Sequence, residues 1–198
     1  LVGSEMCIRD RDMGIDISGK IVIARYGGNF RGYKAKFAEA AGAAGLIIYT
    51  DPIDSGYFKG LTYPEGPYYS ESTIQRGSLL TEDFTGDPLT PYEPALPLDG
   101  MIKIKRKKPE DAQLHSIPVT PIGYGAAKKI LGQMKGDVVP NGWQGGLPFT
   151  YRLQGGSDLK LFLEVNQPRE FVRVQNVIGT VKGSLYPDEW VILGDNLI

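Results

Sequence analysis

The sequence contains a single cysteine, Cys7, and a single histidine, His115, among its 198 residues. One cysteine cannot form an internal disulfide, so it gives no indication of the redox compartment. With so few nitrogen and sulfur ligands, a zinc site inside the chain would have to be mostly carboxylate, which is atypical. No serine or cysteine nucleophile motif lies near His115, and the acidic residues show no ligand spacing. The sequence therefore predicts no catalytic centre within the chain.

Strong net charge and long apolar runs are also lacking. The formal net charge is −1, which excludes bulk attraction to nucleic acid or to an anionic membrane. No apolar run approaches the roughly 18 residues that a membrane span requires. The basic run from Lys103 to Lys108 is followed at once by Pro109-Glu110-Asp111, which predicts a solvated turn instead of a phosphate-binding patch.

What the chain does have is a strand–helix–strand pattern between Gly19 and Pro52. Hydrophobic residues make up 41% of the sequence, which is sufficient for a globular core. Short apolar runs at Ile21–Ala24 and Leu46–Tyr49 predict two buried strands. Between them, an alanine-rich stretch from Tyr33 to Ala44 predicts a helix that Gly45 ends. We expect one βαβ unit.

The alanines indicate which side of that helix is buried. Ala35, Ala38 and Ala41 recur at helical spacing, so we expect them to lie against the sheet. By the same pattern, Lys34, Lys36 and Glu39 are expected to point into water.

The remainder of the chain carries weaker signals. Residues 53–113 show no helical period and are rich in glycine, proline and aromatic residues, which predicts an ordered but irregular excursion. The later predictions are an edge strand at Ile117–Val119, a helix from Gly123 to Lys135, and further strands at Leu159–Val165, Phe171–Val181 and Trp190–Leu193.

Several motifs resemble the protease-associated (PA) domain of glutamate carboxypeptidase II-like metallopeptidases and their transferrin-receptor relatives. The matching pieces occur in the order of that family and cover roughly Gly14 to Gly194. They are GKIVIARYG, FRG, AGAAGLIIYTDP, QRGS, GDPLTP, SIPVTPIGY and NVIGTVKGSLYPDEWVILG.

The resemblance implies an α+β fold in which mixed β-sheets are flanked by two main helices. It implies a PA domain at residues 14–170 and the truncated start of a zinc-peptidase domain at residues 171–198, which would form a two-stranded remnant of the peptidase sheet. Residues 1–13 match nothing in the family, and SEMCIRDR resembles translated adapter sequence. We therefore predict an artefactual or disordered terminus there.

The resemblance also implies a substrate site and a calcium site. In similar enzymes, the residues at the positions of Arg31 and Phe30 line the pocket for the C-terminal residue of the substrate, with the arginine on its α-carboxylate. Ser78 stands where such enzymes carry a pocket asparagine. The main-chain oxygens of Thr90 and Glu93 match positions that help to hold a structural calcium ion.

The two zinc ions of such enzymes would be held by residues outside this chain. Asn196 stands where similar peptidases carry the first zinc-ligating histidine. Two explanations are open: the chain is a truncated piece of an active peptidase, or its parent protein lacks the zinc ligands. We expect the isolated chain to be inactive and to bind zinc poorly.

Two classes of function are open for the longer parent protein. The first is a dizinc exopeptidase that removes acidic C-terminal residues, with this chain as its substrate-capping PA domain. The second is a non-catalytic interaction module of a transferrin-receptor-like ectodomain. The expected partners are a peptide with a free, acidic C-terminus and the remainder of the peptidase chain, with a homodimeric parent and no nucleic acid. The resemblance suggests a secreted or membrane-anchored parent, but the sequence leaves localisation open.

Overall fold

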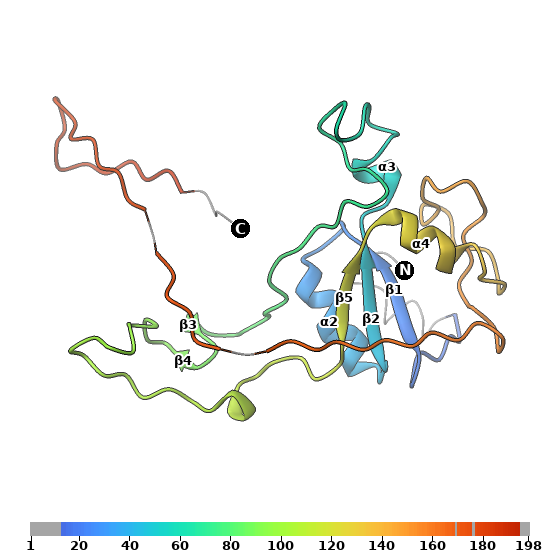
Figure 1. Ribbon diagram of the computed structural model, residues 1–198, viewed down its shortest axis with the longest axis horizontal. Coiled ribbons are helices and arrows are strands. Elements are labelled where there is room, and N and C mark those ends of the chain that lie inside the picture. The colour runs from blue at the N-terminus through green and yellow to red at the C-terminus, as the bar shows by residue number, and fades with distance from the viewer. Residues whose placement is uncertain (1–12, 169, 176, 195–198) are drawn as a thin grey trace.

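The computed structural model describes residues 13–168, 170–175 and 177–194. Its centre is a three-stranded parallel sheet in the order β1-β2-β5 (Figure 1). The strands are β1 (Ile21–Arg25), β2 (Gly45–Tyr49) and β5 (Val119–Ile122). β1 and β2 are in register from Ile21 opposite Gly45 to Arg25 opposite Tyr49. With helix α2 (Arg31–Ala40) between these strands, the predicted βαβ unit is confirmed.

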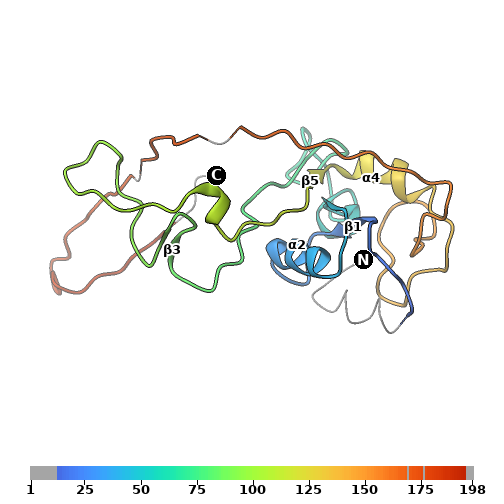
Figure 2. The same cartoon turned by 90° about the horizontal axis from the view of Figure 1, so that it is seen from below.

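Two helices cover the two faces of this sheet. α2 packs Ala35 and Ala38, both fully buried, against Val22, Ala24 and Ile48. α4 (Tyr124–Leu131) packs Ala127 and Leu131 against the opposite face, which presents side chains such as Ile47 and Tyr49. Figure 2 shows the helices on opposite sides of the strands. Small side chains allow close approach of α2 to the sheet, and the fold is mixed α and β, as predicted.

The boundaries of α2 differ from the prediction. The helix begins at Arg31 and ends at Ala40. Two residues later, Gly42 adopts φ +78°. The amide of Ala43 donates to Ala38 O, and the amide of Gly42 donates to Glu39 O. This is the Schellman arrangement, so Gly42 closes the helix and not Gly45. Gly45 instead begins β2.

The burial of Lys34 also contradicts the prediction. Lys34 was expected to face water, but only 1% of it is exposed. It lies one turn before Ala38 in α2, and residues at this spacing share a helix face. The buried face of the helix is therefore wider than its alanines alone indicate.

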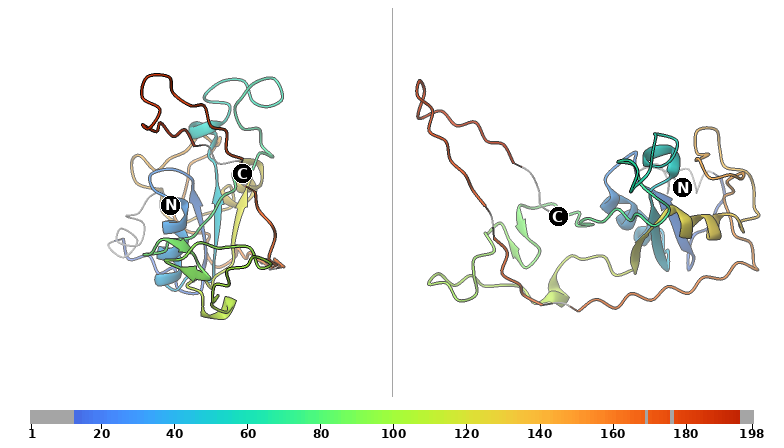
Figure 3. Two further views of the ribbon diagram at one scale, coloured as in Figure 1. Left: turned by 90° about the vertical axis from the view of Figure 1, so that its left-hand side faces the viewer. Right: turned by 45° about the horizontal axis from the view of Figure 1, so that its top comes forward.

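The excursion from Ile53 to Gln113 has little regular structure, as predicted. Its short elements are α3 (Pro52–Ser55), the antiparallel pair β3 (Gly86–Asp87) and β4 (Thr90–Pro91), and a 3₁₀ turn at Pro109–Asp111. Figure 3 shows the part that contains β3 and β4 extending away from the three-layer body. After it, the predicted edge strand is confirmed as β5, shifted toward the C-terminus, and α4 is shorter than its predicted helix.

The predicted strand at Leu159–Val165 is wrong. The expected alternation is present only in part: Leu163 packs on the α4-side core while Phe162 is 89% exposed, but Leu161 and Val165 are each 37% exposed. The segment nevertheless crosses the end of the sheet instead of running beside an edge strand (Figure 1). Its backbone therefore joins no ladder, because a ladder requires a neighbouring strand alongside.

The predicted strands at Phe171–Val181 and Trp190–Leu193 do not form in the described part of these segments. Their apolar side chains are exposed, with Val177 at 92% and Val191 at 90%. A strand needs neighbours for its backbone groups and a second layer for its apolar face, and the described residues supply neither. No helix in the described residues is long and apolar enough to cross a membrane.

Candidate functional site

The start of α2 brings together the three residues that were predicted to bind substrate. Arg31 is the first residue of the helix, and Phe30 is its N-cap residue with no capping side-chain bond. The guanidinium carbon of Arg31 lies 5.3 Å from the ring centroid of Phe30, which is a cation–π distance. Segment 75–81, which contains Ser78, crosses the same helix terminus, as the close contacts of two glycines show.

Gly32 and Gly77 permit this crossing because neither has a side chain. A β-carbon on Gly32 would lie 2.4 Å from Leu79 O, so any other residue would push segment 75–81 away. A β-carbon on Gly77 would lie 1.8 Å from the Nη2 atom of Arg31. The guanidinium therefore rests directly on the backbone of Gly77. The motifs FRG and QRGS, about 45 residues apart in the sequence, form one contact surface.

Segment 75–81 is held at both ends. The hydroxyl of Tyr26 donates to Gln75 O at 2.8 Å. Burial raises the pKa of this hydroxyl, and the positive charge of Arg31 offsets part of that effect, so the phenol stays a neutral donor. At the other end, Nε2 of His115 lies 3.0 Å from Leu79 O.

His115 belongs to a structural cluster. Its Nδ1 atom lies 3.2 Å from Glu39 Oε2, and the amide of Ser116 donates to the other carboxylate oxygen of Glu39 at 2.8 Å. Burial raises the pKa of Glu39, but the hydrogen bonds from Ser116 and His115 outweigh burial and leave the pKa lowered. This cluster ties α2 to segment 75–81 and to the chain entering β5. No group of three or more metal-ligating side chains occurs in the residues that the structure describes.

Arg31 has unused binding capacity. Its Nε atom is buried and has no hydrogen-bond partner, and among the described residues no carboxylate lies within ion-pair distance of the guanidinium. Phe30 is 40% exposed, and Ser78 is also exposed. The hydroxyl of Ser78 accepts a bond from Leu80 N at 3.1 Å, which leaves its own proton free to donate. This arrangement can take a carboxylate from solvent, with Phe30 as an apolar wall.

The two residues predicted for calcium lie elsewhere, in the excursion. Thr90, in β4, is 1% exposed, and the amide of Glu93 donates to Thr90 O at 3.1 Å. The carbonyl oxygens of Thr90 and Glu93 lie 2.7 and 3.0 Å from the place where a β-carbon on Gly86 would stand. Two carbonyl oxygens thus converge on one side of the Gly86 backbone. Oxygen ligands of this kind suit calcium, although two are fewer than it requires.

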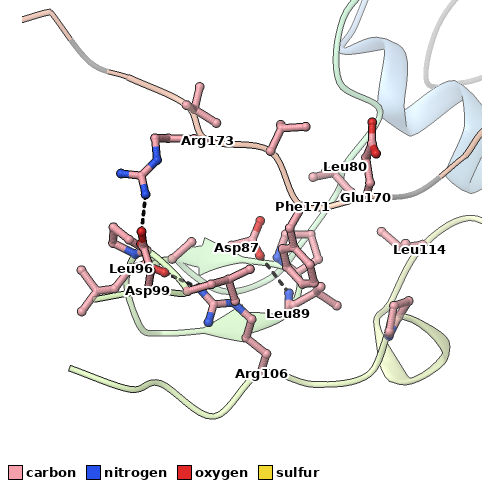
Figure 4. Close-up of a pocket in the computed structure, with 17 residues that line it drawn as sticks. Leu80, Asp87, Leu89, Leu96, Asp99, Arg106, Leu114, Glu170, Phe171 and Arg173 are labelled. Atoms are coloured by element: carbon pink, nitrogen blue, oxygen red, sulfur yellow. Dashed lines mark hydrogen bonds and ion pairs between the residues drawn. The ribbon is translucent and has the colours of Figure 1, made fainter. Parts of the chain in front are cut away.

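A cavity of about 730 Å³ lies between the excursion and residues 170–174 (Figure 4). Much of its wall is apolar. Most of the charged side chains that line it already have partners, since Arg173 bonds Asp99 at 2.6 Å, Arg106 donates to Leu96 O and Asp87 accepts from Leu89 N. Glu170 is the one charged lining residue without a partner among the described residues, and it is an anion, unlike Arg31.

Sequence reasoning missed a second buried cluster, at the end of β2. Asp51 was predicted only to stop the strand, but it is 0% exposed. Its carboxylate accepts bonds from the amides of Ile53 and Gly146 and from the hydroxyls of Tyr49 and Tyr151. The sequence signal was the Asp-Pro pair, which is also typical of a capped helix start.

Comparisons with known proteins bear on the family of the chain. A family model described as PA domain matches residues 1–80, so the chain carries a PA domain. It is also a relative of glutamate carboxypeptidase-like and transferrin-receptor-like proteins, as three matches illustrate.

A glutamate carboxypeptidase 2 homolog of Caenorhabditis briggsae is 37% identical over 93% of this chain and 24% of its own length. Aminopeptidase NAALADL1 of Rattus norvegicus is 35% identical over 92% of this chain and 25% of its own length. Transferrin receptor protein 2 of Homo sapiens is 31% identical over 93% of this chain and 21% of its own length. The chain thus spans about a quarter of the length of these relatives.

Proposed function

We propose that residues 14–170 act as the substrate-capping PA domain of a larger zinc exopeptidase. In this proposal, Arg31 holds the C-terminal carboxylate of a peptide, Phe30 forms the apolar wall of the pocket, and Ser78 donates a hydrogen bond to the bound residue. Residues 171–198 begin the peptidase domain of the parent, where two zinc ions held by residues outside this chain would activate water. Calcium held in part by Thr90 and Glu93 would brace the excursion against that domain.

One observation carries the proposal: the guanidinium of Arg31 rests on Gly77, beside Phe30, without a carboxylate partner in the described residues. A cation at a helix N-terminus is unfavourable, because the free amides there already carry partial positive charge. The same position becomes favourable when an anion arrives, since guanidinium and helix terminus then act on one carboxylate. A free C-terminus is such an anion.

The chemistry of Ser78 bears on the choice of substrate. A serine is smaller than the asparagine of similar enzymes and offers fewer hydrogen bonds. We therefore propose a peptide with a free and preferably acidic C-terminus, without strict selection for glutamate.

The test is made in the longer parent protein. Arg31→Ala should raise KM by about 10- to 100-fold for peptides with a free C-terminus, which corresponds to losing a charge-assisted pair of about 1.5–3 kcal/mol. Arg31→Lys should recover part of the loss, because an ammonium cannot form the bidentate contact. Arg76→Ala is the matched control, because Arg76 is exposed in the same segment. An equal effect on C-terminally amidated peptides would contradict the proposal.

The second candidate is a non-catalytic interaction module, which the similarity to transferrin receptor protein 2 favours. The coding sequence downstream of Gly194 separates the two candidates. A His-x-Asp motif followed by further acidic and histidine ligands supports the peptidase, and their absence supports the receptor-like module. A homodimeric parent is compatible with either.

A further inference from the structure

Lys34 is a buried cation whose ammonium has no acidic partner in the described residues. Its Nζ atom donates to Gly27 O at 2.9 Å and to Asn29 Oδ1 at 2.8 Å. It stands in the first turn of α2, where the helix dipole disfavours positive charge. Burial, and secondarily the charge of Arg25, lower the pKa of Lys34 to about 8. Burial and the helix dipole therefore both disfavour a positive charge on Lys34. The contribution of Lys34 to the structure is its two hydrogen bonds.

Both bonds go to the turn that joins β1 to α2. Gly27 and Gly28 have φ of +99° and +76°, and Gly27 forms a bridge with Asn29. Two successive glycines have no side chains to pack and many accessible conformations, so such a turn is loose unless something ties it down. Lys34 connects Gly27 and Asn29, the residues on either side of Gly28 in this turn, to the body of the helix.

Fixing Asn29 also fixes the two residues after it in the chain. Asn29 directly precedes Phe30 and Arg31, and its side-chain carbonyl oxygen is held by Lys34. That bond orients the amide and leaves Nδ2 buried without a partner, as Nε of Arg31 also is. The residues on either side of Phe30 thus each keep a buried, unused donor.

We propose that Lys34 is a positioning residue for the carboxylate clamp: through Gly27 and Asn29 it sets the entry of α2, so that the guanidinium of Arg31 is held on Gly77. This inference rests on the proposed function of Arg31, but the geometric part can be tested separately. Lys34 touches no substrate in this role. Because a neutral amine also donates hydrogen bonds, the role does not depend on the charge of Lys34.

The experiment uses the 198-residue chain and follows backbone-amide NMR shifts during titration with acetyl-alanyl-glutamate, in parallel with its C-terminal amide. Lys34→Met keeps the length of the side chain but removes the donors. It should shift the amides of residues 27–32 and weaken binding of the free acid by about 10-fold, the loss expected for about 1.4 kcal/mol. Lys36→Met, on the exposed side of the same helix, should do neither.

A double variant separates positioning from general destabilisation. In an Arg31→Ala background, Lys34→Met should cause no further loss of binding, because the two substitutions act through one contact. Where Lys34→Met does not fold, Asn29→Ala removes one acceptor while retaining the lysine, and it should weaken binding in the same way.

Two results overturn the inference: a folded Lys34→Met or Asn29→Ala protein that binds the free acid as tightly as wild type, or amides of residues 27–32 that do not move in Lys34→Met. A wild-type protein that does not respond to the free acid contradicts the proposed function alone. In that case, shifts of residues 27–32 in Lys34→Met, and not in Lys36→Met, still support the positioning role.

Discussion

Replacing Asp51 by alanine should destabilise the fold strongly. The carboxylate is fully buried and accepts from the amides of Ile53 (3.0 Å) and Gly146 (2.7 Å) and from the hydroxyl of Tyr49 (3.2 Å), and Tyr151 also donates to it. Both tyrosines are themselves 4% exposed or less. Burial raises the pKa of both hydroxyls, so they remain protonated donors at neutral pH.

The magnitude depends on the donors left behind. A buried donor without an acceptor costs about 1–3 kcal/mol, and Asp51→Ala leaves three such donors in the closed interior, from Gly146, Tyr49 and Tyr151. Relief of the desolvation cost of the carboxylate offsets part of this. We expect a net loss of about 3–6 kcal/mol, a large share of the roughly 5–15 kcal/mol that stabilises a domain.

Urea unfolding measures this loss through the fluorescence of Trp143, which is 7% exposed and lies in the loop that Asp51 holds. The midpoint should fall with little change in the slope. Asp83→Ala is the matched control, because Asp83 is exposed. A free energy of unfolding for Asp51→Ala within about 1 kcal/mol of the control would refute the reasoning.

Three further predictions concern other parts of the chain. Between about pH 7.5 and 9.5, the melting temperature should rise more steeply for wild type than for Lys34→Met. Lys34 has a pKa of about 8 in the folded state and about 10.5 in the unfolded state, so the unfolded state binds more protons in this range and a rising pH favours the folded state. Parallel curves for the two proteins would contradict this. Gly77→Ala should displace the guanidinium of Arg31 and therefore raise KM in the parent almost as much as Arg31→Ala does. Its melting temperature should stay within a few degrees of that of the control Gly179→Ala. Calcium should raise the melting temperature of the longer parent but not of this chain, since Thr90 and Glu93 offer only two carbonyl ligands; no shift in either protein would remove the site.

The sequence was sufficient to predict the βαβ unit because its signals are local. Short apolar runs and an alanine face each depend on neighbours within a few residues, and β1, α2 and β2 match them, although Gly42 and not Gly45 closes α2. The same reasoning failed for Lys34, because charge alone was taken to indicate exposure. A lysine at helical spacing from Ala38 belongs to the buried face when a turn nearby offers acceptors for its ammonium.

Asp51 and the segment 159–165 show a different limit. The partners of Asp51 include Gly146 and Tyr151, about 95 and 100 residues away, and no local pattern indicates that they meet. In segment 159–165 the alternation correctly predicted that Leu163 faces the core, but alternation records only which side chains are covered. Whether a strand forms depends on a neighbour running alongside, which is a property of the whole fold.

The candidate site combines both kinds of information. Its first half, Phe30 and Arg31, is placed by the local βαβ unit and by Lys34. Its second half, Gly77 and Ser78, lies in an irregular segment whose position depends on two distant contacts, from Tyr26 to Gln75 O and from His115 to Leu79 O. Substitutions at Tyr26 or His115 should therefore release the second half while leaving the first intact. Binding that survives the loss of these two contacts would show that Arg31 holds a carboxylate without the support of segment 75–81.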